Sequence, residues 1–482
     1  MPNRRQRALK EIASWSIDAK LEDNERYFYK TFEVDMLLNG DKSYVIGRKG
    51  TGKTAIAKFL KSHVSYDFFA QDISLKNFPF NELYSLKDSA YTNPNEYITI
   101  WKYIIYMELL SLMRKNQALS PTFRKDIESI LPKKPTQGFL RRIKNITSKT
   151  FNLDAKILSY SQDSEYIKEE LSWIEKVDVL EDLILNNIDR YKYFIIFDEL
   201  DEDYSYQSAI EPTGEYLNLI SGLFKAVQYI KSLAFESNLK INPVIFLRDD
   251  IYSLIKDNDK NKWSDLEVNL SWTQNSIQPL LAHRLSRAFD QHSKSESHNF
   301  GQIWSEIFSK EAILYGKNRK KEITIYDWIT RESLLRPRDY VKYIQLCAKK
   351  VYESNHSHIY PTTVTTQDIL YSRYFRSELT DEVHSLMPDI DVIFDIFSKI
   401  GKAYLNISDF KTMYDSYIEQ GKLKNDTNYM VVLEILFNFS IIGNCMRNSD
   451  KEVFRYINSE ASLNFDLPIT LHRGLHKSLQ LF

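Results

Sequence analysis

The chain has 482 residues, of which 43% are hydrophobic, and its formal net charge is −1 at pH 7. This length suffices for two to four domains, and the balanced charge excludes a chain that is basic throughout. The two cysteines, Cys347 and Cys445, exclude a disulfide framework and fit a reducing cytosol. The N-terminal residues lack the apolar segment of a signal peptide, and no apolar run reaches the about 18–20 residues that cross a membrane. We therefore expect a cytoplasmic protein with no membrane partner.

Residues 1–41 predict a helical lead-in, and the first site signal follows it directly. Residues 42–46 are a short apolar run typical of a buried strand, residues 47–54 read GRKGTGKT, and residues 55–63 have helical spacing. The spacing G-x-x-x-x-G-K-[ST] is that of a phosphate-binding loop between a strand and a helix. The alternative, a glycine-rich turn without a ligand, does not account for the strand and the helix on either side.

The residues of this loop have the chemistry that a triphosphate requires. Glycines let the backbone curl so that successive N–H groups face the phosphates, and the helix N-terminus adds its own free N–H groups. Lys53 is expected to reach the β- and γ-phosphate oxygens, and the Thr54 hydroxyl to bind Mg²⁺. The residues expected to bind the nucleotide are Gly47, Arg48, Lys49, Gly50, Thr51, Gly52, Lys53, Thr54 and Ala55.

A long insertion separates this loop from the next strand of the site. A helix is expected from residue 95 to about residue 115, and residues 114–150 carry ten basic and two acidic residues, a net charge of +8. An acidic amphipathic helix is expected at about 164–188. Three interpretations of the basic segment stay open: it binds nucleic-acid phosphates, it docks on the acidic helix, or it is a solvated loop.

The magnesium side of the site is expected at the end of a second buried strand. Residues 193–197 are a continuous apolar run, as in a strand that is covered on both faces, and Asp198 and Glu199 follow it. We predict that Asp198 holds Mg²⁺ through water and that Glu199 orients the attacking water, with Asp201 as the rival for that role. The alternative is an acidic turn without a catalytic function.

Two arginines are candidates for sensing the γ-phosphate. An amphipathic helix at about 214–236 leads to a strand at residues 243–247, and Arg248 stands at the tip of that strand. Pro337 suits the first turn of a helix, and Arg338 would project from the start of this helix. Each arginine could instead be an ordinary surface residue, Arg248 with a local aspartate partner.

Around these motifs the chain divides into a core, a lid and a C-terminal module. Residues 42–250 are expected to form the core, with the helical and basic insertion at about 114–190, and residues 251–375 an all-helical lid. In residues 376–482, helices near 389–400, 408–419 and 428–439 precede short strands at 440–443 and 452–456, which predicts a winged helix. Its charge is balanced and its third helix has no lysine or arginine, so we expect it to pack on the lid or on another protein rather than to read DNA.

Together these motifs resemble the AAA+ and STAND classes of P-loop ATPases, and most closely bacterial STAND-like ATPases with a C-terminal winged helix. The segments that carry the resemblance are GRKGTGKT, FIIFDELDE, VIFLRDD and LLRPRDY. The resemblance implies a three-layer α/β core with a parallel sheet, a helical lid, a winged helix and a switch driven by ATP, with Arg248 as the first sensor and Arg338 as the second. The chain departs from these classes in one respect: Lys53 and Asp198 are 145 positions apart, a gap that a helical insertion must fill.

ATP is expected as the nucleotide by elimination. The text nearest to the guanine-reading N-K-x-D, at residues 261–265, has the wrong spacing and no preceding strand, and no ABC signature precedes Asp198. The sequence therefore predicts a Mg-ATP-dependent switch ATPase. We expect it to form homo-oligomers, and we expect ATP to control either this oligomerisation or the binding of a separate protein effector. The resemblance implies a role in anti-phage defence. Two alternatives stay open: an AAA+ ATPase that acts directly on DNA or RNA through its basic insertion, and a scaffold that binds nucleotide without turnover.

Overall fold

The structure is a computed structural model that describes residues 4–63, 65–75, 80–84, 95–131, 172–203, 214–289, 299–423, 427–446 and 451–481. The chain folds into two compact units. The core unit consists of Lys30–Arg48 and Lys53–Leu270, and the C-terminal unit consists of Met1–Tyr29, Lys49–Gly52 and Ser271–Phe482. The middle of the glycine-rich loop therefore belongs to the C-terminal unit, while both ends of the loop belong to the core unit.

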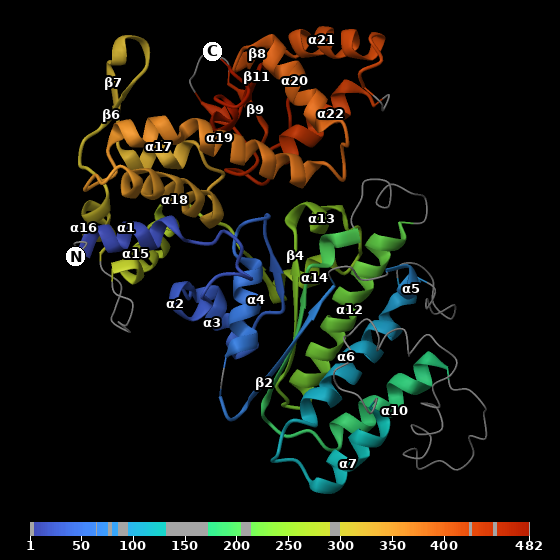
Figure 1. The fold of residues 1–482 in the computed structure, drawn as a ribbon. Coiled ribbons are helices and arrows are strands. Elements are labelled where there is room, and N and C mark those ends of the chain that lie inside the picture. The colour runs from blue at the N-terminus through green and yellow to red at the C-terminus, as the bar shows by residue number, and fades with distance from the viewer. Residues whose placement is uncertain are drawn as a thin grey trace. The chain divides into compact units, whose positions relative to one another are not determined.

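The core unit is built on a parallel sheet of five strands in the order β2-β3-β4-β1-β5 (Figure 1). The continuous apolar runs predicted a doubly covered sheet, and β3 and β4 are buried along almost their whole length, as expected. The sheet places β4 between β1 and β3, so the strand that ends at Arg248 lies beside both. The strands are β1 (Tyr44–Ile46), β2 (Phe68–Ser74), β3 (Lys192–Asp198), β4 (Ile241–Leu247) and β5 (Glu267–Asn269).

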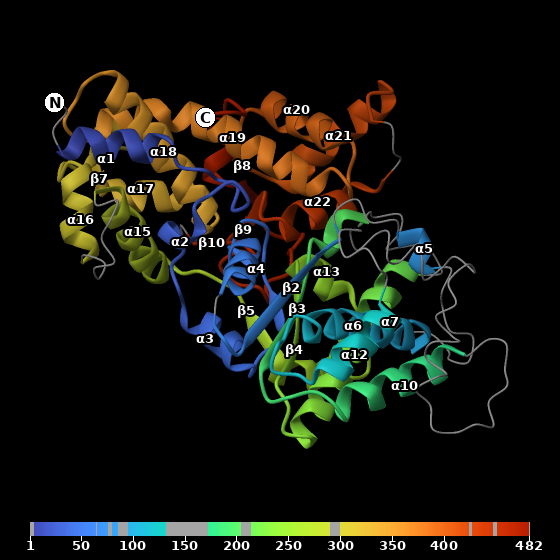
Figure 2. The ribbon, with the colours of Figure 1, turned by 60° about the horizontal axis from the view of Figure 1, so that its bottom comes forward.

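Helices cover both faces of this sheet and give the core the predicted three layers. Helix α4 (Lys53–Ser62) lies on one face, and α6 (Ile98–Met113) and α12 (Glu215–Glu236) lie on the other (Figures 1 and 2). Helix α6 is apolar on all sides because it is packed between the sheet and its neighbouring helices. The other core helices are α3 (Phe32–Asn39), α5 (Phe80–Tyr84), α7 (Pro121–Ile130), α10 (Trp173–Leu185), α13 (Asp249–Leu254) and α14 (Lys260–Trp263).

The described part of the insertion consists of α7 and α10, and α10 docks on the core through its acidic residues. The Glu181 carboxylate accepts hydrogen bonds from the hydroxyls of Tyr106 at 2.5 Å and Tyr229 at 2.9 Å, and it lies 3.3 Å from the Lys102 ammonium. This carboxylate therefore pairs with residues of α6 and α12. Residues 132–171, with most of the predicted basic charge, lie outside the described residues.

The first half of the C-terminal unit is mainly helical. Helix α1 (Arg4–Ala13) packs on α15 (Gln274–Phe289) and α18 (Pro337–Glu353), so the predicted lead-in contributes its first helix to this unit. Helix α18 begins at Pro337, as predicted, and its buried face includes Val341, Ile344, Ala348 and Val351. The other elements are α2 (Asn24–Tyr27), α16 (Phe300–Ile307), β6 (Ile313–Tyr315), β7 (Lys321–Ile323), α17 (Ile325–Arg331) and α19 (Pro361–Val383).

The second half of this unit has three helices and an antiparallel sheet with the strand order β10-β9-β11-β8. The predicted helices are present as α20 (Ile390–Ile400), α21 (Ile407–Glu419) and α22 (Tyr429–Asn438). Helix α22 buries an apolar face and presents no cation, as its sequence indicated. Strands β9 (Ile442–Cys445) and β10 (Glu452–Val453) were predicted nearby, whereas β8 (Tyr404–Leu405) and β11 (Ile469–Leu471) were not.

The expectation that residues 251–375 are all helical is wrong in two places. Strand β5 pairs in parallel with β1 and completes the edge of the core sheet, so the core continues to Leu270. Strands β6 and β7 form an antiparallel hairpin between α16 and α17. All three strands have only three residues, which is too short to show a periodicity of two in the sequence. Across the described ranges, no helix is long and apolar enough to cross a membrane.

Candidate nucleotide-binding site

The glycine-rich loop connects β1 to α4 and has the backbone that its glycines allow. Gly50 and Gly52 adopt φ values of +85° and +108°, which favour glycine because other residues would be strained there. Gly47 does not have a positive φ; its N–H donates to the Leu247 carbonyl at 3.2 Å and so holds the start of the loop against β4. Helix α4 begins at Lys53, which places Lys53, Thr54 and Ala55 in its first turn, where N–H groups lack partners within the helix.

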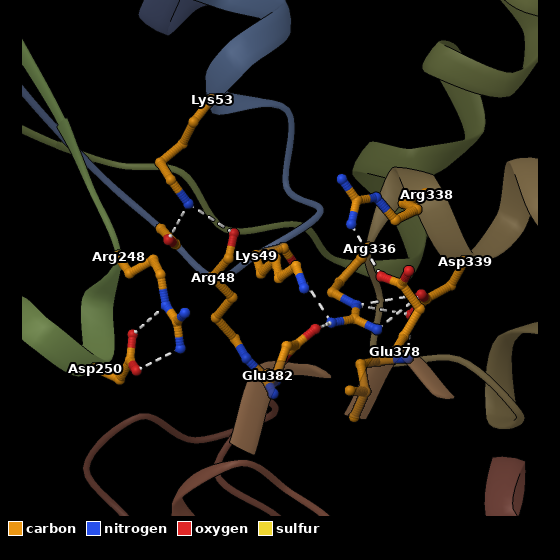
Figure 3. Close-up of polar contacts among 12 residues, drawn as sticks. Arg48, Lys49, Lys53, Arg248, Asp250, Arg336, Arg338, Asp339, Glu378 and Glu382 are labelled. Carbon is orange, nitrogen blue, oxygen red and sulfur yellow. Dashed lines mark hydrogen bonds and ion pairs between the residues drawn. The ribbon is translucent and has the colours of Figure 1, made fainter. Parts of the chain in front are cut away.

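Lys53 is half-buried, and its ammonium is held by the loop itself. Its Nζ donates to the carbonyl oxygens of Gly47 at 2.5 Å and Arg48 at 2.9 Å (Figure 3). Burial lowers the pKa of Lys53, while the charges of Asp201, Asp249 and Asp198 act in the opposite direction. The ammonium therefore lies within the field of three carboxylates that come from the ends of β3 and β4.

The structure brings together the two residues predicted to hold magnesium. Asp198 ends β3, and its carboxylate accepts hydrogen bonds from the Thr54 hydroxyl and from the Glu199 backbone N–H. Burial raises the pKa of Asp198 to about 6, and these hydrogen bonds oppose that shift. No cluster of three or more His, Cys, Asp or Glu side chains forms a ready metal site within the described ranges.

Glu199, the predicted base, stands at the start of the turn after β3. Its backbone has φ +62°, an uncommon value for a residue with a side chain. The Ser74 hydroxyl at the end of β2 donates a short hydrogen bond to the Glu199 carboxylate. The rival, Asp201, also belongs to this region: its charge acts on Lys53, and its carboxylate is 3.5 Å from the Arg248 guanidinium. Sequence reasoning did not find Ser74, because its partner lies 125 residues away.

Arg248 stands at the tip of β4 and caps the start of α13. It is only 8% exposed, and its guanidinium donates to both carboxylate oxygens of Asp250, at 2.9 Å and 2.7 Å (Figure 3). The local aspartate partner that the sequence allowed is therefore present, but the arginine is buried and does not lie on the surface. Asp249, which sequence reasoning missed, is half-buried; burial raises its pKa, while Arg48 and Lys53 lower it.

Within the C-terminal unit, side chains hold the loop segment Lys49–Gly52. The Trp272 indole N–H donates to the Thr51 carbonyl at 2.9 Å, and the Arg336 guanidinium donates to the Lys49 carbonyl at 3.3 Å. A Cβ added to Gly50 would come within 3.4 Å of the Arg338 Cβ. The predicted second sensor thus lies beside the loop, and its guanidinium pairs with Glu378 at 2.9 Å.

Arg336 is the residue of α18 that sequence reasoning missed. It is 1% exposed and is enclosed by two buried carboxylates, those of Asp339 at 3.0 Å and Glu382 at 2.5 Å (Figure 3). Burial acts to lower the pKa of Arg336, but Asp339 and Glu382 outweigh it and raise that pKa well above its usual value. The spacing of Arg336 and Asp339 around Pro337 could have suggested their pair, whereas Glu382 lies on the next helix.

The arrangement fits a nucleoside triphosphate with magnesium. Positive-φ glycines and a helix N-terminus offer N–H donors, Lys53 and Arg248 offer cations, and the Thr54–Asp198 pair offers oxygen ligands. The loop connects a buried strand of a parallel sheet to a helix, and a second strand ends in an aspartate two positions along the sheet. These features together define a P-loop ATPase fold.

Comparisons with known proteins found similar sequences. A family model described as the FunZ-associated C-terminal helical domain matches residues 275–380. A curated Escherichia coli (strain K12) protein, described as a transposon gamma-delta 80.3 kDa protein, is 23% identical over 457 residues, which cover 89% of this chain. The chain spans 60% of the length of that curated relative.

Three solved structures are also similar to this chain. The Aeropyrum pernix ORC2 protein, solved in ADPNP and ADP complexes, has a TM-score of 0.41 at 12% identity, covering 93% of this chain and 89% of its own. Cdc6p from Pyrobaculum aerophilum has a TM-score of 0.32 at 12% identity, and the match covers 98% of this chain and 95% of the Cdc6p chain. A chain of the Drosophila ORC bound to DNA has a TM-score of 0.29 at 11% identity, and the match covers 99% of this chain and 92% of that chain.

Proposed function

We propose that the protein is an AAA+-type ATPase that binds Mg-ATP on the loop at residues 47–54 and uses the bound nucleotide as a switch. The observation that carries this proposal is the convergence of Lys53, Thr54 and Asp198 at the ends of β1 and β3. A phosphate-binding loop alone fits many ligands, but a carboxylate that interacts with both a neighbouring hydroxyl and the charge of the loop lysine fits a triphosphate with its metal.

Each residue has a role that follows from its position. Lys53 and the loop N–H groups bind the phosphates, Thr54 and Asp198 hold the metal, and Arg248 responds to the γ-phosphate from the tip of β4. When bound, Mg²⁺ offsets the negative charge on the phosphate oxygens. Glu199 accepts the proton of the attacking water, and Ser74 holds the Glu199 carboxylate at the end of β2.

The switch is proposed to act through the loop segment Lys49–Gly52. Arg336 and Trp272 donate hydrogen bonds to backbone carbonyls of this segment. A change in the loop backbone on phosphate binding would therefore move the hydrogen-bond acceptor of Arg336, which directly precedes α18. We propose that this change gates homo-oligomerisation or the binding of a separate protein effector, with the three-helix and sheet module acting as a winged helix. A role in anti-phage defence is part of the same proposal.

A second candidate function is direct action on DNA or RNA. The curated relative is described as a transposon protein, which supports a nucleic-acid partner. Nucleic-acid binding is one of the three interpretations that the sequence leaves open for the basic insertion. Its described residues include Lys115, whose ammonium donates to the Gln71 side chain at 3.2 Å.

The variant Glu199→Gln tests the proposal by separating ATP binding from hydrolysis. Without a base the attacking water is no longer activated, so phosphate release is expected to fall by about 100-fold or more. ATP binding, measured by calorimetry, is expected to stay close to that of the wild type, because the amide keeps the size of the side chain.

The matched control is Asp201→Asn, which removes a carboxylate from the same turn. It is expected to keep most of the turnover. A Glu199→Gln variant that hydrolyses ATP at the wild-type rate would contradict the assignment, and loss of turnover in Asp201→Asn alone would move the base to Asp201.

A further inference from the structure

The β6–β7 hairpin carries a concentration of positive charge that the nucleotide site does not use. The segment at residues 310–322, here called the basic hairpin, contains five basic and two acidic residues, a net charge of +3. Its strands pair Ile313 with Ile323 and Tyr315 with Lys321. In Figure 1 the hairpin extends past α17, to which it is joined.

The root of the basic hairpin is fixed by apolar and aromatic contacts. Ile313 is buried, and the Tyr315 ring lies edge-on to the Trp328 ring of α17 at 6.1 Å. The Arg331 guanidinium lies over both rings, 3.5 Å from the centre of Trp328 and 4.9 Å from that of Tyr315, and its charge is paired with Glu332 at 3.2 Å. The hairpin is therefore held without help from the cations at its tip.

The tip presents its cations to solvent. Gly316, Asn318 and Arg319 all adopt left-handed backbone conformations, with φ of 78°, 65° and 52°, which turn the chain tightly. The side chains of Arg319, Lys320 and Lys321 are exposed, and none of them forms an ion pair with another residue that the structure describes. Some exposed lysines elsewhere do pair with a nearby aspartate, as Lys411 does with Asp415 at 3.0 Å. Three adjacent like charges repel each other, and an anionic partner would relieve that repulsion.

We propose that the basic hairpin binds the phosphate backbone of double-stranded DNA. A two-stranded ribbon fits the major groove of B-form DNA, and lysine and arginine at its tip reach phosphate oxygens. Single strands are bound mainly by stacking bases on free aromatic rings. The Tyr315 ring is already in contact with Trp328 and Arg331, so the hairpin offers no such platform. This contact lies on a different element from the basic insertion and goes beyond the proposed ATPase activity.

The test measures binding of the full-length protein to a fluorescent duplex of mixed sequence, at about 50 mM and about 200 mM salt. The triple variant Arg319→Gln, Lys320→Gln, Lys321→Gln removes the exposed cations of the tip. It is expected to bind the duplex at least about tenfold more weakly, because contacts with phosphates are lost. The slope of log K against log salt concentration is expected to flatten by about 0.9 for each lost contact, and so by up to about 2.7 for three contacts. A single-stranded probe is expected to bind more weakly than the duplex.

The matched control is Lys10→Gln, Lys349→Gln, Lys350→Gln, which removes the same charge from exposed sites of the same unit. It is expected to bind the duplex within about twofold of the wild type, since long-range charge effects are screened by salt. Both variants are checked by thermal unfolding and by ATP calorimetry. Unchanged ATP binding in the tip variant separates this proposal from the proposed ATPase function.

Three outcomes would overturn the proposal. One is a tip variant that binds the duplex as well as the wild type, and another is a wild-type protein that shows no duplex binding at the lower salt concentration. The third is a polyglutamate peptide that binds the wild-type protein more tightly than the duplex and loses binding in the tip variant, which would assign the hairpin to an acidic protein partner.

Discussion

At the scale of single residues, burial opposes the charges of the proposed nucleotide site. Burial lowers the pKa of Lys53 and raises the pKa of Asp198 and of Asp249, so each group is shifted towards its neutral form. A triphosphate beside Lys53 and a cation beside Asp198 would each stabilise the charged form. The site is therefore expected to gain stability from Mg-ATP, as a protein does when a ligand binds only its folded state.

Glu332 in the C-terminal unit gives a pH prediction that is independent of the nucleotide. Burial, followed by the charge of Asp368, raises the pKa of Glu332 to about 7, while Arg331 and Arg473 oppose this shift. A carboxyl with a raised folded-state pKa contributes stability that is present at low pH and lost as the pH rises through that value. The wild-type free energy of unfolding is therefore expected to fall between about pH 4.5 and pH 7, by up to about 3 kcal/mol relative to Glu332→Gln.

The measurement is denaturant unfolding of both proteins across this pH range, with Glu311→Gln as the control at an exposed position. The control is expected to follow the wild-type curve. Parallel curves for the wild type and Glu332→Gln would show that Glu332 does not titrate in this window.

At the scale of elements, the start of α18 holds two arginines that are expected to behave in opposite ways. Arg336→Met leaves Asp339 and Glu382 buried without their cation, so it is expected to cost about 3–5 kcal/mol of stability. Arg338 is 26% exposed in its side chain and pairs with Glu378, so Arg338→Ala is expected to cost at most about 1 kcal/mol. If Arg338 senses the γ-phosphate, its loss is expected to lower kcat by about tenfold or more.

Denaturant unfolding and steady-state phosphate release on the same two variants check this contrast. Equal losses of stability in Arg336→Met and Arg338→Ala would mean that the buried ion pairs of Arg336 with Asp339 and Glu382 do not stabilise the fold as expected. An unchanged kcat in Arg338→Ala would remove Arg338 from the second sensor position.

The elements also show where sequence reasoning works and where it stops. The loop at residues 47–54, strands β3 and β4, and the start of α18 each have a continuous local pattern, so their positions and types could be predicted. Strand β5 is held by its pairing with β1, and three residues carry no pattern of their own. The contacts of Glu199 with Ser74 and of Arg336 with Glu382 join residues that are 125 and 46 positions apart. Such pairs depend on the packed structure and leave no local trace in one sequence.

At the scale of the whole molecule, the glycine-rich loop contributes to both compact units. Its ends, with Gly47, Arg48 and Lys53, belong to the core unit, and its middle belongs to the C-terminal unit. The N-terminal helix α1 also joins the C-terminal unit, so the units are not simple halves of the chain.

The central claim is that Lys53 and its loop bind Mg-ATP, and calorimetric titration of the full-length protein tests it most directly. The wild type is expected to bind Mg-ATP, and Lys53→Ala to bind it at least about tenfold more weakly, because a hydrogen bond to a charged group contributes about 1.5–3 kcal/mol. Lys61→Ala is the matched control, since Lys61 lies on the same helix and pairs with Asp72 at 2.6 Å. It is expected to bind Mg-ATP as the wild type does. A folded Lys53→Ala variant that binds Mg-ATP with wild-type affinity would contradict the account.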